Sequence, residues 1–331
     1  MSDPLRLALP SSGALYQSAL DLLSACGLAV HRTNLRRYTA EIRALPGVVV
    51  SFQRGSDITA KIEEGSADIG IVGKDRFLES RRGDGDTRVV LELGFGRSQL
   101  VMAAPDSWVD VTSVADLADL SVEFRDQGED LRVATKYPRL TERHLLDHGV
   151  NYFSLVQSSG TLEAAPAMGF ADVVADITES GTTLRENHLK QIHGGSIIQS
   201  QACLVSRRFV DGADGPDGRQ LASARALAEM IEAHLAAKSY YSITANMHGE
   251  SADEVGQYIL AHAEISGLRG PSISAVHAQD SSGWYAVTVI VEQERLLSAV
   301  EQLRGIGGTS VTVSKPDYVF HSTCQAHERL T

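Results

Sequence analysis

The chain has 331 residues, of which 43% are hydrophobic and 22% are charged, so it can bury more than one core, and two or three domains are expected. A formal net charge of −12 argues against a nucleic-acid-binding surface, which needs a basic footprint. No stretch approaches the roughly 18 apolar residues of a membrane span, and the N-terminal residues lack the features of a signal peptide. The three scattered cysteines form neither a zinc motif nor a disulfide framework, so a cytoplasmic location is expected.

The first unit is expected over residues 1–95, with a returning segment at 195–237, and it alternates strands and helices. Leu5, Leu7 and Leu9 share one side of a strand, which a turn joins to a helix at residues 15–23. The elements predicted after that helix are a strand at 47–52, a helix at 57–65 and a buried strand at 68–73. Strands separated by helices predict an α/β fold with a mainly parallel sheet.

The second unit is expected over residues 96–194 and continues this alternation. Its predicted elements are a strand at 99–105, a helix at 113–120, a strand at 131–138, a helix at 141–149, and strands at 151–157 and 170–177. Ligands of such open sheets bind beyond the carboxyl ends of the strands. The segment after the last of these strands is therefore a candidate site.

The rest of the chain first returns to the first unit and then changes its pattern. Residues 194–209 predict one long strand, 211–218 a turn-rich linker, and 219–237 an alanine-rich helix. The elements predicted after that are strands at 240–247, 272–278, 283–292 and 309–320, with helices at 251–262 and 294–306. The order βαββαβ predicts a ferredoxin-like domain over residues 238–331.

The segment VVADITESGTTL, residues 173–184, is poorly suited to a core. A loop between a strand and a helix offers free backbone N–H groups, and Gly181 allows a phosphate to approach them closely. Ser180, Thr182 and Thr183 add hydroxyl donors, each worth roughly 1.5–3 kcal/mol to a charged oxygen. Asp176 and Glu179 suit ribose hydroxyls or a bound Mg²⁺ instead.

Phosphoribosyl pyrophosphate presents a monophosphate, ribose hydroxyls and a Mg²⁺-bound pyrophosphate together, so it fits this segment. The alternative is that Thr182 or Thr183 only caps a helix at residues 184–192, with the acids facing solvent.

The longer stretch of residues 158–192 resembles the ATP phosphoribosyltransferase family in Glu163, in Gly169 and in the loop from Asp176 to Leu184. RRYTAEIRALPG, FQRGSDI and ADIGIVG resemble the first domain of that family, and SITANMHGESADEV and LRGIGGTSVTVSKPDYVF resemble the regulatory domain of its long form. The resemblance implies two periplasmic-binding-protein-like lobes around a cleft, followed by the ferredoxin-like domain.

The activity that the resemblance implies is the joining of ATP and phosphoribosyl pyrophosphate to give N1-(5-phosphoribosyl)-ATP and pyrophosphate, the first step of histidine biosynthesis. It also implies Mg²⁺, feedback inhibition by histidine, and a homo-oligomer ranging from dimer to hexamer. Because adenine N1 is already a nucleophile, arginines that position two anions should matter more than a strong base.

The resemblance and the loop chemistry together give a set of predicted site residues. Arg54 and Asp176 are the predicted catalytic residues, and Asp176 and Glu179 are the predicted Mg²⁺ contacts. The other predicted substrate-binding residues are Arg37, Asp57, Gly73, Ser159, Gly160, Thr161, Glu163, Thr178, Glu179, Ser180, Gly181, Thr182, Thr183 and Leu184. Simpler roles stay open for some of them, with Asp57 and Glu163 as helix caps and the two arginines as surface residues.

The turn after the first strand departs from the family pattern. The family usually carries a Lys and an Arg there, whereas this chain has PSSGAL, with Ser11, Ser12 and Ala14. Arg32, Arg36 or Lys74 would have to substitute, or nucleotide binding is weakened. The departure keeps two alternatives open: a non-catalytic regulatory paralogue or two-lobed solute sensor, and a phosphoribosyltransferase with another acceptor base.

Overall fold

The structure is a computed structural model that describes residues 3–34, 37–83, 85–157, 161–211, 218–265, 267–268, 270–277 and 283–331. Two compact units make up the chain. The first comprises Met1–Ala228 with Ala326–Thr331, and the second comprises Glu229–Gln325. Each unit is described separately below.

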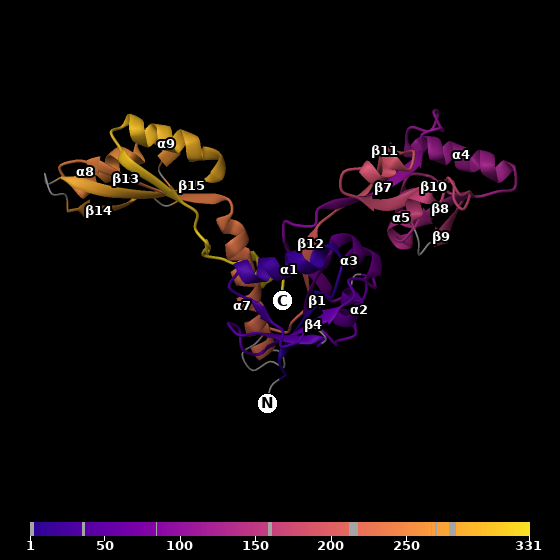
Figure 1. Cartoon of the computed structure of the whole chain (residues 1–331), viewed down its shortest axis with the longest axis horizontal. Coiled ribbons are helices and arrows are strands. Elements are labelled where there is room, and N and C mark those ends of the chain that lie inside the picture. The colour runs from indigo at the N-terminus through magenta and orange to yellow at the C-terminus, as the bar shows by residue number, and fades with distance from the viewer. Residues whose placement is uncertain are drawn as a thin grey trace. The chain divides into compact units, whose positions relative to one another are not determined.

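The first unit contains two sheets, and the larger of them has seven strands in the order β2-β3-β4-β1-β5-β12-β6. Its strands are β1 (Leu5–Pro10), β2 (Val30–His31), β3 (Thr39–Ile42), β4 (Val48–Gln53), β5 (Ile69–Gly73), β6 (Thr87–Glu92) and β12 (Ala202–Arg207). Because β4, β1 and β5 are parallel, their carboxyl ends meet at one edge. The helices α1 (Ala14–Ala25), α2 (Ile58–Glu63) and α3 (Lys74–Ser80) accompany this sheet, which we call lobe 1 (Figure 1).

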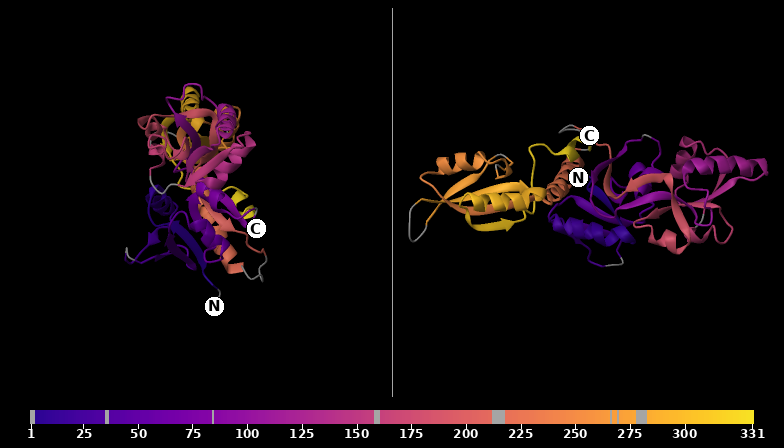
Figure 2. Two further views of the ribbon diagram at one scale, coloured as in Figure 1. Left: turned by 90° about the vertical axis from the view of Figure 1, so that its right-hand side faces the viewer. Right: turned by 90° about the horizontal axis from the view of Figure 1, so that it is seen from above.

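The second sheet has five strands in the order β11-β7-β10-β8-β9, and we call it, with its helices, lobe 2. Its strands are β7 (Ser98–Pro105), β8 (Leu131–Thr135), β9 (Phe153–Gln157), β10 (Val173–Thr178) and β11 (Leu189–Ser200). The helices α4 (Val114–Asp126) and α5 (Pro138–Asp147) share a core with one face of this sheet. Figures 1 and 2 show lobe 2 with its helices beside the sheet. The short helices η1 (Leu162–Ala164) and α6 (Thr182–Glu186) supply Leu162 and Leu184 to the core of the other face.

Two segments join the lobes, and one of them corrects a prediction. The single strand expected at 194–209 is two strands, β11 in lobe 2 and β12 in lobe 1, separated at Gln201. Gln201 lies between these two strands. Its side-chain Oε1 accepts from Gly94 N–H at 3.0 Å, and its Nε2 donates to Glu92 at 2.5 Å. The chain therefore passes from one sheet to the other at Gln201, whose side chain is hydrogen-bonded to Gly94 in the other segment that joins the lobes.

The prediction of a helix over residues 184–192 is also wrong after Glu186. α6 ends at Glu186, and β11 begins at Leu189 after His188, whose φ is +58°. Leu189 pairs with Pro105 of β7, and His188 C=O accepts from Asp106 N–H at 2.8 Å. Pairing with a distant strand thus overrides the local helical pattern.

The second unit has four antiparallel strands in the order β14-β15-β13-β16. Its elements are β13 (Tyr240–His248), α8 (Ala252–Leu260), η2 (Ala263–Ile265), β14 (Ser272–Val276), β15 (Trp284–Glu292), η3 (Gln293–Arg295), α9 (Leu296–Gly305) and β16 (Thr309–Ser314). Val255 and Ile259 of α8 and Leu303 of α9 share one core with the strands, so both helices cover the same face. The predicted ferredoxin-like order is confirmed, although β16 ends at Ser314 rather than at residue 320.

The helix α7 (Gly218–Ala237) carries the boundary between the units, and the short α10 (Gln325–Glu328) lies close to the C-terminus. No helix among the described residues combines the length and the apolar character needed to cross a membrane. The α/β fold class, with two lobes and a ferredoxin-like domain, agrees with the prediction. The sheets of the two lobes are mixed rather than mainly parallel, because β3, β7, β11 and β12 pair antiparallel with their neighbours.

Candidate active site

The loop of residues 178–183, which we call the hydroxyl loop, joins β10 to α6 and is shaped by its own side chains. Thr178 Oγ1 accepts a hydrogen bond from Gly181 N–H at 2.7 Å, and the Ser180 and Thr182 hydroxyls lie 2.9 Å apart. Gly181 has a φ of +72° and precedes α6 with no side-chain cap. Neither Thr182 nor Thr183 is therefore the N-cap of α6, which was the alternative that the sequence left open.

Arg185 brings a positive charge to the hydroxyl loop. Its Nη1 donates to Ser180 C=O at 3.2 Å, and its Nη2 donates to Thr182 Oγ1 at 3.1 Å. Sequence reasoning missed this residue, although an arginine one helical turn after the loop glycine could have indicated it. An anion held by the loop hydroxyls would lie beside this guanidinium, which favours a phosphate.

Asp176 lies on β10 two residues before the loop. Partial burial raises the pKa of its carboxyl, and this is opposed by a hydrogen bond from Ile177 N–H at 2.8 Å and by Lys136 and Arg76 nearby. Glu163 also raises this pKa, which places the two predicted acids within electrostatic reach of each other. The structure thus brings η1 and the end of β10 together.

A buried hydrogen-bond network connects the two lobes next to these acids. Tyr137 Oη donates to Asp75 Oδ2 at 2.6 Å, and Ser200 Oγ donates to Asp75 Oδ1 at 2.6 Å. Burial, and then the charge of Asp75, raise the pKa of Tyr137, so its hydroxyl stays a donor. The guanidinium of Arg76 stacks over the Tyr137 ring, 4.3 Å from its centroid.

The sequence did not reveal this network, because its members are 62 and 125 residues apart. A signal was nevertheless present, since Asp75 and Tyr137 each lie two residues after a strand, β5 and β8, at the sheet edges where ligands bind. α3 and α5 also meet where the Glu79 carboxylate accepts from Arg139 and Leu140 N–H, both at 3.0 Å.

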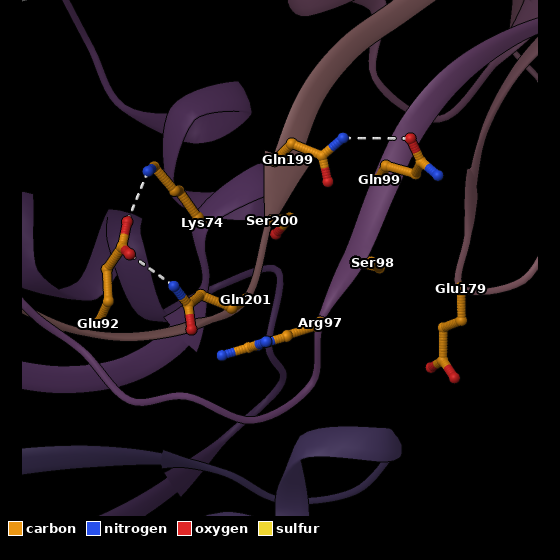
Figure 3. Close-up of a pocket in the computed structure, with 9 residues that line it drawn as sticks. All are labelled: Lys74, Glu92, Arg97, Ser98, Gln99, Glu179, Gln199, Ser200 and Gln201. Carbon is orange, nitrogen blue, oxygen red and sulfur yellow. Dashed lines mark hydrogen bonds and ion pairs between the residues drawn. The ribbon is translucent and has the colours of Figure 1, made fainter. Parts of the chain in front are cut away.

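Two adjoining cavities lie between the hydroxyl loop and lobe 1. The first, of about 210 Å³, is lined by Ser12 and Ala14 of the turn after β1, and by Ile177 and Glu179. The second, of about 270 Å³, is polar and contains Lys74, Glu92 and Arg97 (Figure 3). Ser98 and Glu179 line both cavities, so the two form one continuous candidate site.

Other predicted residues lie at varied distances from these cavities. Gly73 ends β5 and lines the smaller cavity, where a Cβ would collide with Oδ1 of Asp75, so glycine leaves room for that carboxylate. Thr161 is exposed just before η1, whereas Leu184 is buried and anchors the loop in the core of lobe 2. Ser159 and Gly160 lie outside the described residues.

The three predicted residues around β4 do not line either cavity. Arg54 is exposed, with Gly55 beside it at the cavity wall. Asp57 precedes α2 without a capping bond and accepts from Ser56 Oγ at 2.8 Å instead. Arg37 is exposed, and its C=O accepts from Arg32 Nε at 2.6 Å. Asp57 therefore does not make the side-chain hydrogen bond that a role as helix cap would need.

Arg32, Arg36 and Lys74 are the candidates to replace the Lys and Arg that the turn after β1 lacks. Arg32 lies over the Phe52 ring, 4.4 Å from its centroid, and is held by Arg37 C=O. Arg36 lies outside the described residues. Lys74 lines the larger cavity, but its Nζ pairs with Glu92 at 2.6 Å.

Comparison with known proteins identifies the relatives of this chain. The family model for ATP phosphoribosyltransferase matches residues 54–232, and the model for the C-terminal domain of these enzymes matches residues 237–315. ATP phosphoribosyltransferase 2, chloroplastic, of Arabidopsis thaliana is 39% identical over 327 residues, which cover 96% of this chain and 78% of that protein. The chain belongs to the ATP phosphoribosyltransferase family.

A bacterial relative agrees over the full length of this chain, and a solved structure agrees over part of it. The Caulobacter vibrioides (strain NA1000 / CB15N) protein is 36% identical over 336 residues, covering 100% of this chain and 98% of its own. The structure of the ATP phosphoribosyl transferase (HisG:HisZ) complex from Thermotoga maritima aligns with a TM-score of 0.52 at 24% identity, over 69% of this chain and 98% of its own, which supports the fold.

The family settles the activity. ATP phosphoribosyltransferases join ATP and phosphoribosyl pyrophosphate in the first step of histidine biosynthesis, so this chain is a glycosyltransferase with those two substrates. The function predicted from residues 158–192 is confirmed. The alternatives, a non-catalytic regulatory paralogue, a two-lobed solute sensor and a phosphoribosyltransferase with another acceptor base, are not supported.

Proposed function

We propose that the hydroxyl loop binds the monophosphate of phosphoribosyl pyrophosphate, with its ribose beside Asp176 and Glu163. The observation that carries this proposal is the hydrogen bond from Gly181 N–H to Thr178, which shapes the turn of the loop. The exposed hydroxyls of the loop and the guanidinium of Arg185 lie around this turn. Backbone N–H groups, hydroxyls and a guanidinium are the donors that bind a phosphate well.

The carboxylate of Asp176 has a separate part in this proposal. Cleavage at ribose C1 develops positive charge on the sugar, which a nearby carboxylate stabilises. Lys136 and Arg76 favour its ionised form against the effects of burial and of Glu163. No side chain needs to act as a strong base, because adenine N1 already carries the attacking electron pair, so the chain has to position the two substrates.

A divalent metal accompanies catalysis in this family, and we propose that it is Mg²⁺. Among the described residues, no group of three or more His, Cys, Asp or Glu side chains is arranged to hold a metal ion. The acids that are present fit a cation that is already bound to the pyrophosphate and takes only one or two carboxylates from the protein. These are Glu179 at the cavity wall and Asp176. When bound, the metal neutralises the departing pyrophosphate.

The remaining parts of the proposal concern regulation and assembly. We propose that residues 238–331 form the regulatory domain and bind histidine as a feedback inhibitor, that the chain is a cytoplasmic homo-oligomer, from dimer to hexamer, and that residues 1–95 and 96–194 form the two catalytic lobes. Regulation and assembly follow from the family resemblance, the cytoplasmic location from the scattered cysteines, and the domain limits from the predicted elements. The domain limits stay predictions. The roles of Arg37, Arg54 and Asp57 in nucleotide binding also stay predictions.

The deciding experiment measures pyrophosphate release by the full chain with ATP, phosphoribosyl pyrophosphate and MgCl₂, with and without histidine. We expect release that needs all three components and that falls when histidine is added. No release under any of these conditions, combined with tight histidine binding by calorimetry, would instead identify a regulatory paralogue. Release that histidine leaves unchanged would remove the regulatory part alone.

A further inference from the structure

We propose that Arg97 is a further substrate-binding residue, whose guanidinium holds polyphosphate oxygens in place of the Lys and Arg that the turn after β1 lacks. This inference rests on the proposed function, because it assigns a residue to the same cleft. The ligand chemistry is a Mg²⁺-bound polyphosphate, supplied either by the triphosphate of ATP or by pyrophosphate.

The position of Arg97 is the first support. Arg97 lies between β6 and β7, on one of the two segments that join the lobes, and its side chain is exposed and lines the larger cavity. Gly96, with a φ of +63°, packs so closely on the Leu15 side chain that a Cβ at residue 96 would overlap it. Arg97 therefore lies next to the first turn of α1, where Ala14 replaces the expected cation.

The second support is the charge balance of the larger cavity. Its two basic residues are Lys74 and Arg97, and its two acidic residues are Glu92 and Glu179. Lys74 Nζ is held by Glu92 at 2.6 Å, and the other oxygen of Glu92 accepts from Gln201 at 2.5 Å. No hydrogen bond or ion pair joins Arg97 to any other residue that the structure describes, and Figure 3 shows this contrast.

The third support is that the remaining wall suits a metal–polyphosphate complex. Glu179 also has no drawn partner in Figure 3, and it offers a carboxylate to the metal. Ser98 and Nε2 of Gln99, whose Oε1 accepts from Gln199 Nε2 at 3.2 Å, add neutral donors to the same wall. A guanidinium that is not neutralised within the protein retains its full capacity for bidentate phosphate binding.

The test is isothermal titration calorimetry on the full chain with MgCl₂, using ATP in one arm and pyrophosphate in the other. We expect Arg97→Gln to weaken at least one of them about 10- to 100-fold, the loss typical of a charged hydrogen bond. The arm that loses affinity identifies the source of the polyphosphate. Arg97→Lys should keep part of the affinity, and Lys74→Gln should have a smaller effect because Glu92 already neutralises that charge.

The matched control is Arg88→Gln on β6, an arginine of lobe 1 that lines neither cavity, and its affinities should equal those of the wild type. A further variant introduces the missing cations. Adding Ser12→Lys and Ala14→Arg to Arg97→Gln should recover affinity. Circular dichroism should show unchanged folding for Arg97→Gln, because this side chain is exposed.

The outcomes separate this inference from the proposed function. Wild-type affinity of Arg97→Gln for both ATP and pyrophosphate, in a chain that releases pyrophosphate normally, overturns the inference and leaves the function intact. A wild-type chain that binds neither ligand and releases no pyrophosphate overturns both.

Discussion

The turn after β1 and the hydroxyl loop after β10 occupy equivalent places in the two lobes, each between a strand and a helix. Each has a glycine with positive φ at the helix N-cap, Gly13 at 84° and Gly181 at 72°, and neither helix has a side-chain cap. The hydroxyl loop has internal hydrogen bonds and Arg185, whereas Ser12 and Ala14 present a small hydroxyl and a methyl group to the smaller cavity. The two glycines share a positive φ but differ in ψ, which is −175° at Gly13 and 5° at Gly181, so the turns differ in backbone geometry as well as in the side chains that they offer a phosphate.

The largest expected effect comes from Asp176, next to the hydroxyl loop. Asp176→Asn should lower kcat/KM about 100- to 1,000-fold, because a preorganised charge opposite the developing positive charge is lost. Steady-state kinetics of pyrophosphate release would measure this. A variant that keeps more than a tenth of the wild-type value would contradict the role given to Asp176.

The same variant tests the pH dependence of stability. Since the folded pKa of Asp176 lies above the ordinary value of 3.8, the folded state binds this proton more tightly than the unfolded state. The contribution of Asp176 to stability is therefore present below 3.8 and lost as pH rises through the folded pKa. Thermal melts should show that Asp176→Asn removes this loss and is at least as stable as the wild type at pH 7.

A paired substitution compares the two turns directly. Alanine at Gly181 strains a left-handed backbone, at about 1–2 kcal/mol, and alanine at Gly13 strains it more, because a φ of 84° with a ψ of −175° is adopted almost only by glycine. A Cβ at Gly181 would in addition lie 3.1 Å from Arg185 Nη1, while a Cβ at Gly13 has no neighbour within 4 Å. We expect the larger loss of stability from Gly13→Ala, but only Gly181→Ala should raise KM for phosphoribosyl pyrophosphate, about tenfold. Equal KM values in the two variants would show that the turns do not differ as described.

The smallest expected effect is at Thr178. Thr178→Val removes the acceptor for Gly181 N–H, which costs about 1 kcal/mol and should raise KM for phosphoribosyl pyrophosphate about fivefold. Thr178→Ser keeps the hydroxyl and serves as the control. If both variants behave alike, the hydrogen bond does not shape the loop for its ligand.

The hydroxyl loop could be predicted from the sequence because its chemistry is contained in a few consecutive residues. The strands β1, β4 and β5 of lobe 1 and most strands of lobe 2 could also be predicted, since buried strands carry continuous apolar runs, whereas β2, β3 and β6 were not predicted. The Asp75, Tyr137 and Ser200 network could not, because only the folded chain brings these distant residues together. Likewise, nothing local to residues 184–192 indicates that Leu189 pairs with Pro105, so a helix was expected where β11 begins.

Gly73 and Asp75 constrain each other in a way that bears on how this cleft can evolve. A methyl group at residue 73 would occupy the space taken by the Asp75 carboxylate and approach Leu15, although the backbone there, with a φ of −67°, accepts any residue. A larger residue at position 73 therefore requires the Asp75 carboxylate to move or to be shortened, so the two positions are expected to vary together.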